Sequence, residues 1–147
     1  MDRVYKFYKT ERFFYRIHML PIAVLIRALM RIVFAFDIPY RAEIGDNTRF
    51  PHDALGVVIH PDAKIGENCH INQNITIGGK SNLEVLPVIG NNVTLGAGSI
   101  VLGNIVVGNN ATVGAGAVVV KDVPDNATVA GVPAVIIKID GDNSANR

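Results

Sequence analysis

Residues 88–119 read VIGNNVTLGAGSIVLGNIVVGNNATVGAGAVV, and a period of six runs through the whole stretch. From Ile89 onward every sixth position is a branched aliphatic residue, and the same phase extends back to Ile59. These positions are Ile59, Ile65, Ile71, Ile77, Leu83, Ile89, Leu95, Val101, Val107, Val113 and Val119. Glycine often follows the aliphatic residue, and a small residue often stands four positions after it, as at Ala111 and Ala117. The pattern indicates stacked repeats.

A period of six matches neither the 3.6-residue period of an α-helix nor the two-residue alternation of a single strand. It matches a triangular coil in which each side is a short strand followed by a bend, so that about 18 residues complete one turn. The aliphatic residue of each hexad points inward, while Gly and Asn accept the left-handed backbone of the bends. On this register Ile65 stacks over Leu83, Val101 and Val119. A stack of coils buries the inner face that a single coil leaves open.

The phase breaks twice. Ile44 and Phe50 share one phase, and Ile59 restarts three residues late, which places an insertion within residues 53–58. In residues 79–87 (GKSNLEVLP), Leu83 keeps the phase while its neighbours lose the pattern, so this stretch is predicted to project as a loop. Loops on a rigid scaffold are common places for function.

Upstream of the repeat, residues 2–36 have helical spacing, and Pro21 is expected to separate two helices. Downstream, Gly131-Val132-Pro133 turns the chain into a polar end. The predicted divisions are therefore an N-terminal helical segment (1–36), a β-helix domain (37–137) and a polar C-terminal tail (138–147). At 147 residues the chain has room for one domain with a modest appendage.

Charge is divided unevenly along the chain. Residues 1–41 carry eight Lys/Arg against three Asp/Glu, whereas residues 42–147 carry six against ten. The acidic body argues against nucleic acid as a partner, and the basic head suggests contact with something anionic. The apolar stretch 19–36 contains Pro21, Arg27 and Arg31, which is poor material for a membrane span. The single cysteine allows no internal disulfide, which fits a cytoplasmic location.

Of the histidines, His52 is the strongest candidate for chemistry, because it falls at the first register break, in Arg-Phe-Pro-His-Asp. A histidine acting as general base needs an acceptor that orients its other ring nitrogen. Asp37 stands 15 residues earlier, close to one coil, and is the candidate acceptor. The alternatives are a structural role for His52 and a helix-capping role for Asp37.

The other histidines have plainer interpretations. His18 falls in the helical segment, His60 precedes Pro61 at a bend, and His70 should point outward from a strand. A zinc site built from His52, His60 and His70 is a second enzymatic alternative, although their spacing does not favour convergence on one corner.

An ordered set of motifs resembles the hexapeptide-repeat acyltransferases, and within them the serine acetyltransferase-like branch. The resemblance covers about two thirds of the chain and implies an all-β fold, a left-handed parallel β-helix of hexapeptide repeats with a short N-terminal α-helical segment. The motifs are FDIP (36–39), IHPDAKIG (59–66), TIGG (76–79), LGAG (95–98), LGNI (102–105), VGAG (113–116) and AGVPA (130–134).

In this family a His–Asp pair activates the acceptor hydroxyl, and the matching residues are His52 and Asp37. The resemblance implies acetyl-CoA as co-substrate, no metal, and a homotrimer with active sites between subunits. Gly79 matches a backbone N–H donor to the thioester oxygen. The positions implied to contact coenzyme A are Ala97 and Ala115 along the pantetheine arm, and Lys121 and Lys138 near the phosphates.

Three departures bear on the acceptor. Pro51 replaces an Asp that precedes the catalytic His in serine-specific members, Val85-Leu86 replaces an Arg-His pair, and the helical domain is short. The resemblance therefore implies an O-acetyltransferase acting on a small hydroxyl acceptor, either a sugar of cell-surface polysaccharide or L-serine. A non-catalytic trimeric scaffold is the alternative outside enzymology. The expected location is the cytoplasm, with peripheral contact between the basic segment and the inner face of the membrane.

Overall fold

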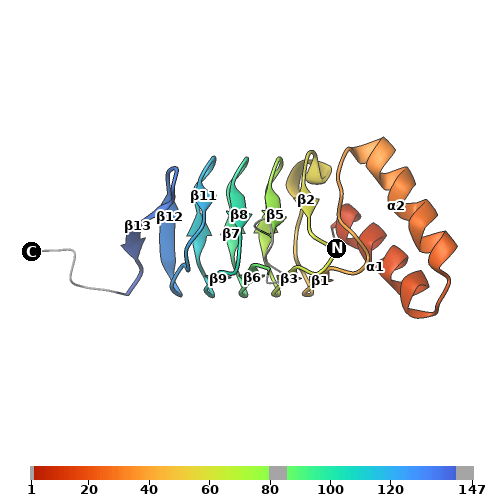
Figure 1. Cartoon of the computed structure of the whole chain (residues 1–147), viewed down its shortest axis with the longest axis horizontal. Coiled ribbons are helices and arrows are strands. Elements are labelled where there is room, and N and C mark those ends of the chain that lie inside the picture. The colour runs from red at the N-terminus through yellow and green to blue at the C-terminus, as the bar shows by residue number, and fades with distance from the viewer. Residues whose placement is uncertain (1, 80–85, 142–147) are drawn as a thin grey trace, which may run out of the picture.

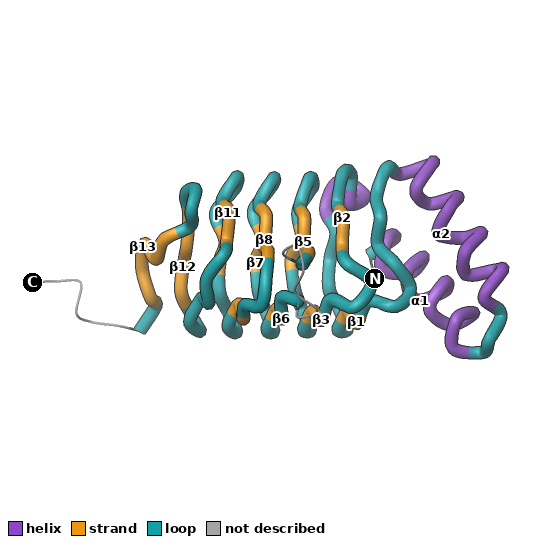
Figure 2. The backbone as a smooth tube through the Cα atoms, viewed as in Figure 1, coloured by secondary structure: helices purple, strands orange, loops and turns teal. Residues whose placement is uncertain are grey.

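The computed structural model describes residues 2–79 and 86–141. It is an elongated parallel β-helix with two α-helices at its N-terminal end (Figure 1). Short strands alternate with bends along the whole coil, and the last strand, β13 (Val135–Ile139), lies at the opposite end from the helices (Figure 2). The triangular coil predicted from the six-residue period is therefore confirmed.

Three sheets form the sides of the coil; their strands are parallel except for the last strand, and each sheet is named here after its first strand. The β1 sheet contains β1 (Glu43–Ile44), β3 (Lys64–Ile65), β6 (Val88–Ile89) and β9 (Val106–Val107). The β2 sheet contains β2 (Val58–Ile59), β5 (Thr76–Gly78), β8 (Ile100–Leu102) and β11 (Val118–Val119). The β4 sheet contains β4 (His70–Ile71), β7 (Thr94–Leu95), β10 (Thr112–Val113), β12 (Ala127–Ala130) and β13 (Val135–Ile139).

The strand register shows how the coil absorbs its two irregularities. Ile44 pairs with Ile65, 21 positions later, which confirms a three-residue insertion in the first coil. Ile65 pairs with Ile89, so the expected stacking of Ile65 on Leu83 is wrong. That coil is 24 residues long, and the extra residues amount to one hexad, which is why the six-residue phase survives. Most of the predicted loop (residues 80–85) lies outside the described residues.

The inward aliphatic residues form one continuous core, and the bends use Asn and Gly. Ile71, Leu95 and Val101 are fully buried. Asn92 and Asn110 adopt positive φ angles, and their side chains form a ladder in which Asn92 Nδ2 donates to Asn110 Oδ1 over 3.1 Å. Asn tolerates the left-handed backbone of the bend, and its side-chain amide forms hydrogen bonds with the neighbouring coil. One residue type therefore both shapes the bend and links the coils.

Glycine at position 66 is required by close packing between coils. A Cβ atom there would lie 2.5 Å from the carbonyl oxygen of Gly90, whereas a Cβ on Gly78 would make only ordinary contact, 3.5 Å from Leu102 Cδ2. We expect Gly66→Ala to lower the free energy of unfolding by about 1–3 kcal/mol, the usual cost of overpacking. Gly78→Ala is the matched control, and urea unfolding measures both. Equal stability of the two variants would contradict the packing argument.

The helical segment folds as two helices, α1 (Arg3–Arg16) and α2 (Leu20–Phe34), which confirms the predicted separation near Pro21. Asp2 caps α1, because its side chain accepts a hydrogen bond from the backbone N–H of Tyr5 over 3.1 Å. Pro21 occupies the first turn of α2, where no backbone donor is lost, and Ala35 ends the helix in a left-handed conformation. Neither helix in the described part of the chain is long and apolar enough to cross a bilayer.

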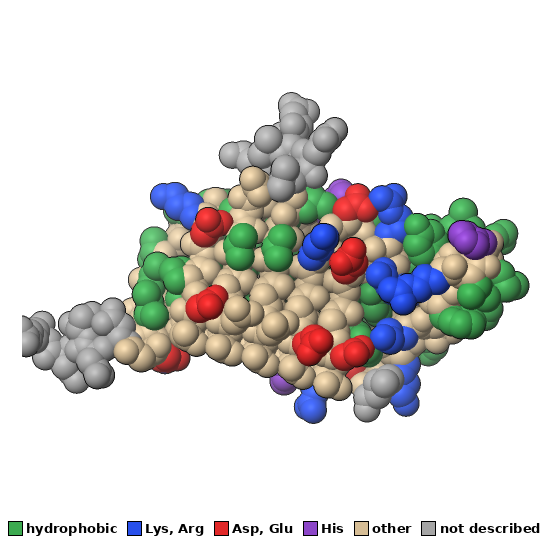
Figure 3. Space-filling model, turned by 90° about the horizontal axis from the view of Figure 1, so that it is seen from below, with side chains coloured by type: hydrophobic (Ala, Val, Ile, Leu, Met, Phe, Trp, Pro, Cys, Tyr) green, Lys and Arg blue, Asp and Glu red, His purple; other side chains and the backbone are tan. Residues whose placement is uncertain are grey.

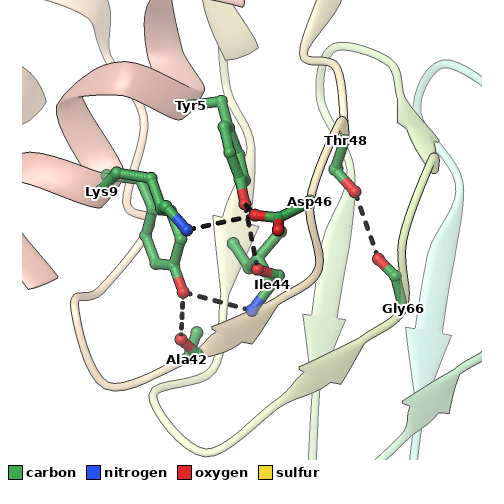
Figure 4. A network of polar contacts seen from close by, with 8 residues as sticks. Tyr5, Lys9, Ala42, Ile44, Asp46, Thr48 and Gly66 are labelled. Carbon is green, nitrogen blue, oxygen red and sulfur yellow. Dashed lines mark hydrogen bonds and ion pairs between the residues drawn. The ribbon is translucent and has the colours of Figure 1, made fainter. Parts of the chain in front are cut away.

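Two tyrosines fasten α1 to the first coil (Figure 4). The Tyr5 hydroxyl donates to Asp46 Oδ1 over 2.9 Å, and Lys9 Nζ reaches the same oxygen over 3.1 Å. The Tyr8 hydroxyl donates to the carbonyl oxygen of Ala42 over 2.7 Å and accepts from the backbone of Ile44 over 3.2 Å. Both phenols are buried, so these contacts satisfy polar groups that would otherwise be costly inside the protein.

The last strand changes direction. β13 pairs antiparallel with β12, and its side chains are all exposed. The strand runs through Ile139 and so crosses the predicted boundary between the β-helix domain and the polar tail at residue 138.

Candidate active site

His52 lies on a strained turn at the corner where the first coil passes from the β4 sheet to the β2 sheet. The turn is the single-turn segment η1 (Pro51–Ala54). His52, Asp53 and Ala54 have φ angles of 56°, 54° and 57°, so three consecutive residues with side chains are left-handed. Each costs roughly 1–2 kcal/mol relative to an ordinary backbone, and such strain is concentrated at functional sites.

Contacts with the start of α1 hold this turn in place. Arg3 Nε donates to Asp53 Oδ1 over 3.1 Å, and a second guanidinium nitrogen of Arg3 pairs with Asp53 Oδ2. Asp2 Oδ2 accepts from the backbone N–H of Phe50 over 3.0 Å, and Ala54 is fully buried. The His52 side chain is exposed, which leaves its imidazole open to a substrate.

Asp37 lies in the layer beneath, bridged by its backbone to Val58 of the β2 sheet. Its side chain is bound by α2: Arg27 donates to Oδ1 from Nε over 2.9 Å and from Nη2 over 2.6 Å. Arg31 Nη1 lies 3.4 Å from Oδ2. Among the described residues no hydrogen bond joins Asp37 to His52, so the expected carboxylate–imidazole contact is not formed here. The capping role is also absent, because α2 ends at Phe34 and Asp37 follows it.

A buried carboxyl group lies close to this ion pair. Glu11 is 3% exposed, and its Oε1 has no hydrogen-bond partner among the described residues. Burial raises the pKa of Glu11 to about 8; Arg27 opposes the rise and Asp37 adds to it. At neutral pH the side chain is therefore mostly protonated and does not neutralise Arg27.

Ala97 and Ala115 follow β7 and β10, at the same β4/β2 corner as His52. The corner is a continuous ladder of backbone hydrogen bonds: Asn74 N–H donates to Leu55 O over 2.8 Å, and Gly116 N–H donates to Ala97 O over 2.9 Å. The structure thus brings His52, Ala97 and Ala115 onto one edge of the coil. Side chains no larger than Cβ at the last two positions leave that edge accessible.

Gly79 and Lys121 lie at the next corner, between the β2 and β1 sheets, where they follow β5 and β11. Lys121 is exposed and borders a cavity of about 260 Å³ with Val119 and Ile136. Lys138 lies on β13 and pairs with Asp140 over 2.9 Å. Within one chain, Gly79 and His52 therefore lie at opposite edges of the β2 sheet.

The remaining histidines do not join His52. His60 lies at the β2/β1 corner and accepts from the backbone of Asp62 at Nδ1 over 3.2 Å, which fits its expected role at a bend. His70 is exposed on β4, as expected for an outward residue. The three proposed zinc ligands thus lie on different parts of the coil, and the described residues contain no cluster of three or more metal-ligating side chains.

Two features of the site escape sequence reasoning. The spacing of Arg27 and Arg31 on one helix is visible, but their shared contact with Asp37 depends on how α2 packs. Likewise, Arg3 and Asp53, which form a salt bridge, are 50 positions apart in the sequence, so no local sequence pattern predicts their contact.

Comparisons with known proteins show what the chain is similar to in sequence and in fold. The family described as bacterial transferase hexapeptide (six repeats) matches residues 87–121. Serine acetyltransferase 1, chloroplastic, from Arabidopsis thaliana is 44% identical over 118 residues, covering 79% of this chain and 37% of the relative.

Two solved structures are similar over most of the chain. Serine acetyltransferase in complex with coenzyme A from Brucella abortus strain S19 has a TM-score of 0.87 at 34% identity, covering 92% of this chain and 55% of that one. Soybean serine acetyltransferase complexed with serine has a TM-score of 0.84 at 38% identity, covering 91% and 56%. The chain thus spans only about half the length of these structures.

The left-handed parallel β-helix expected from the sequence is the fold of these structural relatives. The structural likeness extends over 91–92% of this chain, and the match to the repeat family covers residues 87–121. The chain therefore carries the hexapeptide repeat of the bacterial transferases at residues 87–121 and resembles the serine acetyltransferases in sequence and fold.

Proposed function

We propose that the protein is an acetyl-CoA-dependent O-acetyltransferase with His52 as general base. The observation that carries this proposal is the common corner of His52, Ala97 and Ala115, where a strained, exposed imidazole stands at one end of a smooth backbone edge. From the first coil to the fourth this edge is about 14 Å long at the usual spacing between strands. That length suits a thin, extended acyl carrier lying along the coil.

We further propose that each active site is shared between two chains of a homotrimer. Along the coil, Gly79 precedes Lys121 at the β2/β1 corner, just as His52 precedes Ala115 at the β4/β2 corner. Two chains with parallel coil axes would bring these corners together, so that Gly79 of one chain faces His52 of its neighbour. Lys121 would then approach the phosphates of coenzyme A. Lys138 has a weaker claim to that role, because Asp140 already neutralises it.

The proposed reaction is a direct acyl transfer. His52 removes the proton from the acceptor hydroxyl as its oxygen attacks the thioester carbonyl. The backbone N–H of Gly79 donates to the developing oxyanion, an effect worth about 3–4 kcal/mol per donor in other enzymes. As the tetrahedral intermediate collapses, the C–S bond breaks and protonated His52 returns the proton to the thiolate.

Asp37 remains the proposed orienting group for His52. Arg27 donates two hydrogen bonds to Oδ1, whereas the ion-pair partner of Oδ2 among the described residues is Arg31, at 3.4 Å. A carboxylate oxygen can accept more than one hydrogen bond, so Oδ2 retains capacity for an imidazole N–H.

Two kinds of acceptor hydroxyl are proposed. The names of the relatives favour L-serine. Pro51 and Leu86, which replace polar residues of the serine-specific pattern, favour a sugar hydroxyl such as one of cell-surface polysaccharide. The proposed location for either acceptor is the cytoplasm, which the single cysteine of the chain fits.

Assaying release of coenzyme A with L-serine, homoserine and nucleotide-linked sugars tests the proposal. Turnover with any of these hydroxyl acceptors supports it, and the preferred one identifies the class. Calorimetric titration with acetyl-CoA distinguishes a non-catalytic scaffold: absence of both binding and turnover would contradict the proposed function.

A further inference from the structure

The outer face of α2 is apolar from end to end. The side chains on this face are exposed, although each belongs to a residue type that normally seeks burial. Ile32 is 81% exposed, Val33 64% and Leu25 58%. The face consists of Leu20, Pro21, Val24, Leu25, Ala28, Leu29, Ile32 and Val33. Its members are four adjacent pairs that recur every four residues, so they form one broad stripe along the helix.

This stripe forms part of the end of the molecule that faces away from the β-helix. α1 packs on the first coil, α2 packs on α1, and only Ala23 of α2 is buried. Phe13, Ile17 and Met19 extend the apolar surface around the connection between the helices. Hydrophobic side chains accordingly gather over the helical end of the molecule (Figure 3). An apolar surface of this extent marks a contact site.

The charges on the two helices indicate what kind of partner the apolar face contacts. The two helices carry seven Lys/Arg and one acidic residue, Glu11, which is buried. Arg27 and Arg31 contact Asp37, but the exposed Lys6 and Arg16 form no ion pair within the described part of the chain. Two copies meeting through this end would bring like charges together, whereas an anionic surface would neutralise them.

We propose that the apolar face of α2 docks the protein onto an anionic lipid surface. The helix would lie in the plane of the interface, with Ile32 and Leu25 among the acyl chains and Lys6 and Arg16 near the headgroups. Its 15 residues extend only about 22 Å, too short to span a bilayer but ample to lie on one. Docking does not depend on the proposed acetyl transfer.

Co-sedimentation with vesicles tests this proposal. Wild-type protein should bind vesicles of phosphatidylcholine with phosphatidylglycerol and bind pure phosphatidylcholine vesicles far less. The double variant Leu25→Glu/Ile32→Glu should lower the affinity by about tenfold or more, because both exposed side chains lose their apolar contact and gain negative charge. The matched control Val106→Glu/Val120→Glu makes the same chemical change at exposed valines of the β-helix and should bind as wild type does.

A second variant, Lys6→Glu/Arg16→Glu, tests the electrostatic half of the proposal and should also weaken binding to anionic vesicles. Thermal unfolding and sedimentation velocity without vesicles accompany every variant. Wild-type protein that stays in the supernatant with anionic vesicles would overturn the proposal. So would unchanged binding by Leu25→Glu/Ile32→Glu, or a smaller assembly for that variant in solution, which would assign the face to contact between copies of the chain.

Discussion

Replacing His52 with alanine should lower turnover with acetyl-CoA and the true acceptor by about 10²–10⁴-fold, the usual contribution of a general base. The reason is geometric: the strained turn of η1 holds an exposed imidazole at the end of the smooth edge formed by Ala97 and Ala115. Because the His52 side chain is exposed, its removal should change stability little. Steady-state release of coenzyme A measures the effect, and thermal unfolding checks the fold.

His70→Ala is the matched control, since His70 is also exposed but lies on the regular strand β4. That variant should keep near-normal turnover. If His52→Ala retained near-normal turnover too, the assignment of the general base would be wrong. The KM for acetyl-CoA should change little in either variant, because the imidazole is proposed to act on the acceptor.

Replacing Glu11 with glutamine should stabilise the protein at pH 8 by about 4 kcal/mol and leave it nearly unchanged below pH 4.5. Burial raises the pKa of Glu11 from 4.5 to about 8. Between these values the folded protein holds a proton that the unfolded chain releases, so this group makes the free energy of unfolding fall as pH rises. The slope is about 1.4 kcal/mol per pH unit, and glutamine removes it while keeping the side-chain shape.

Urea unfolding from pH 4 to pH 9 measures the difference between variant and wild type. Glu67→Gln changes an exposed carboxyl and is the control; it should follow the wild-type curve. A Glu11→Gln curve that ran parallel to wild type across this range would show that Glu11 ionises as freely in the folded protein as in the unfolded chain.

Sequence reasoning determines the coil well because the six-residue period is local and redundant. Every inward aliphatic residue marks the same six-residue period, so the early insertion is visible as a shift in the phase of that period. The second insertion is not, because it is one hexad long and leaves Ile89 in phase with Ile65. An insertion of six residues preserves the period, so only the strand pairing reveals it.

The site is predicted less completely, for a different physical reason. His52 stands out because a histidine at a break in a regular repeat is locally unusual, and its strained turn follows from that break. The partner of Asp37 is not local: Arg27 reaches it only because of how α2 packs on α1. Long-range electrostatic contacts leave no periodic signal in the sequence. The pairing of Asp37 with His52 could therefore be predicted from the sequence but not tested with it.

The measurement that tests the shared site most directly combines two inactive chains. His52→Ala chains and Gly79→Pro chains, the latter lacking the backbone N–H donor, are co-expressed with different tags, and trimers carrying both tags are purified. In a cyclic trimer of this kind, one of the three interfaces pairs an intact His52 with an intact Gly79 of the neighbour. The account predicts that mixed trimers recover about one third of wild-type turnover, whereas each parent trimer stays inactive. Mixed trimers as inactive as their parents would contradict it.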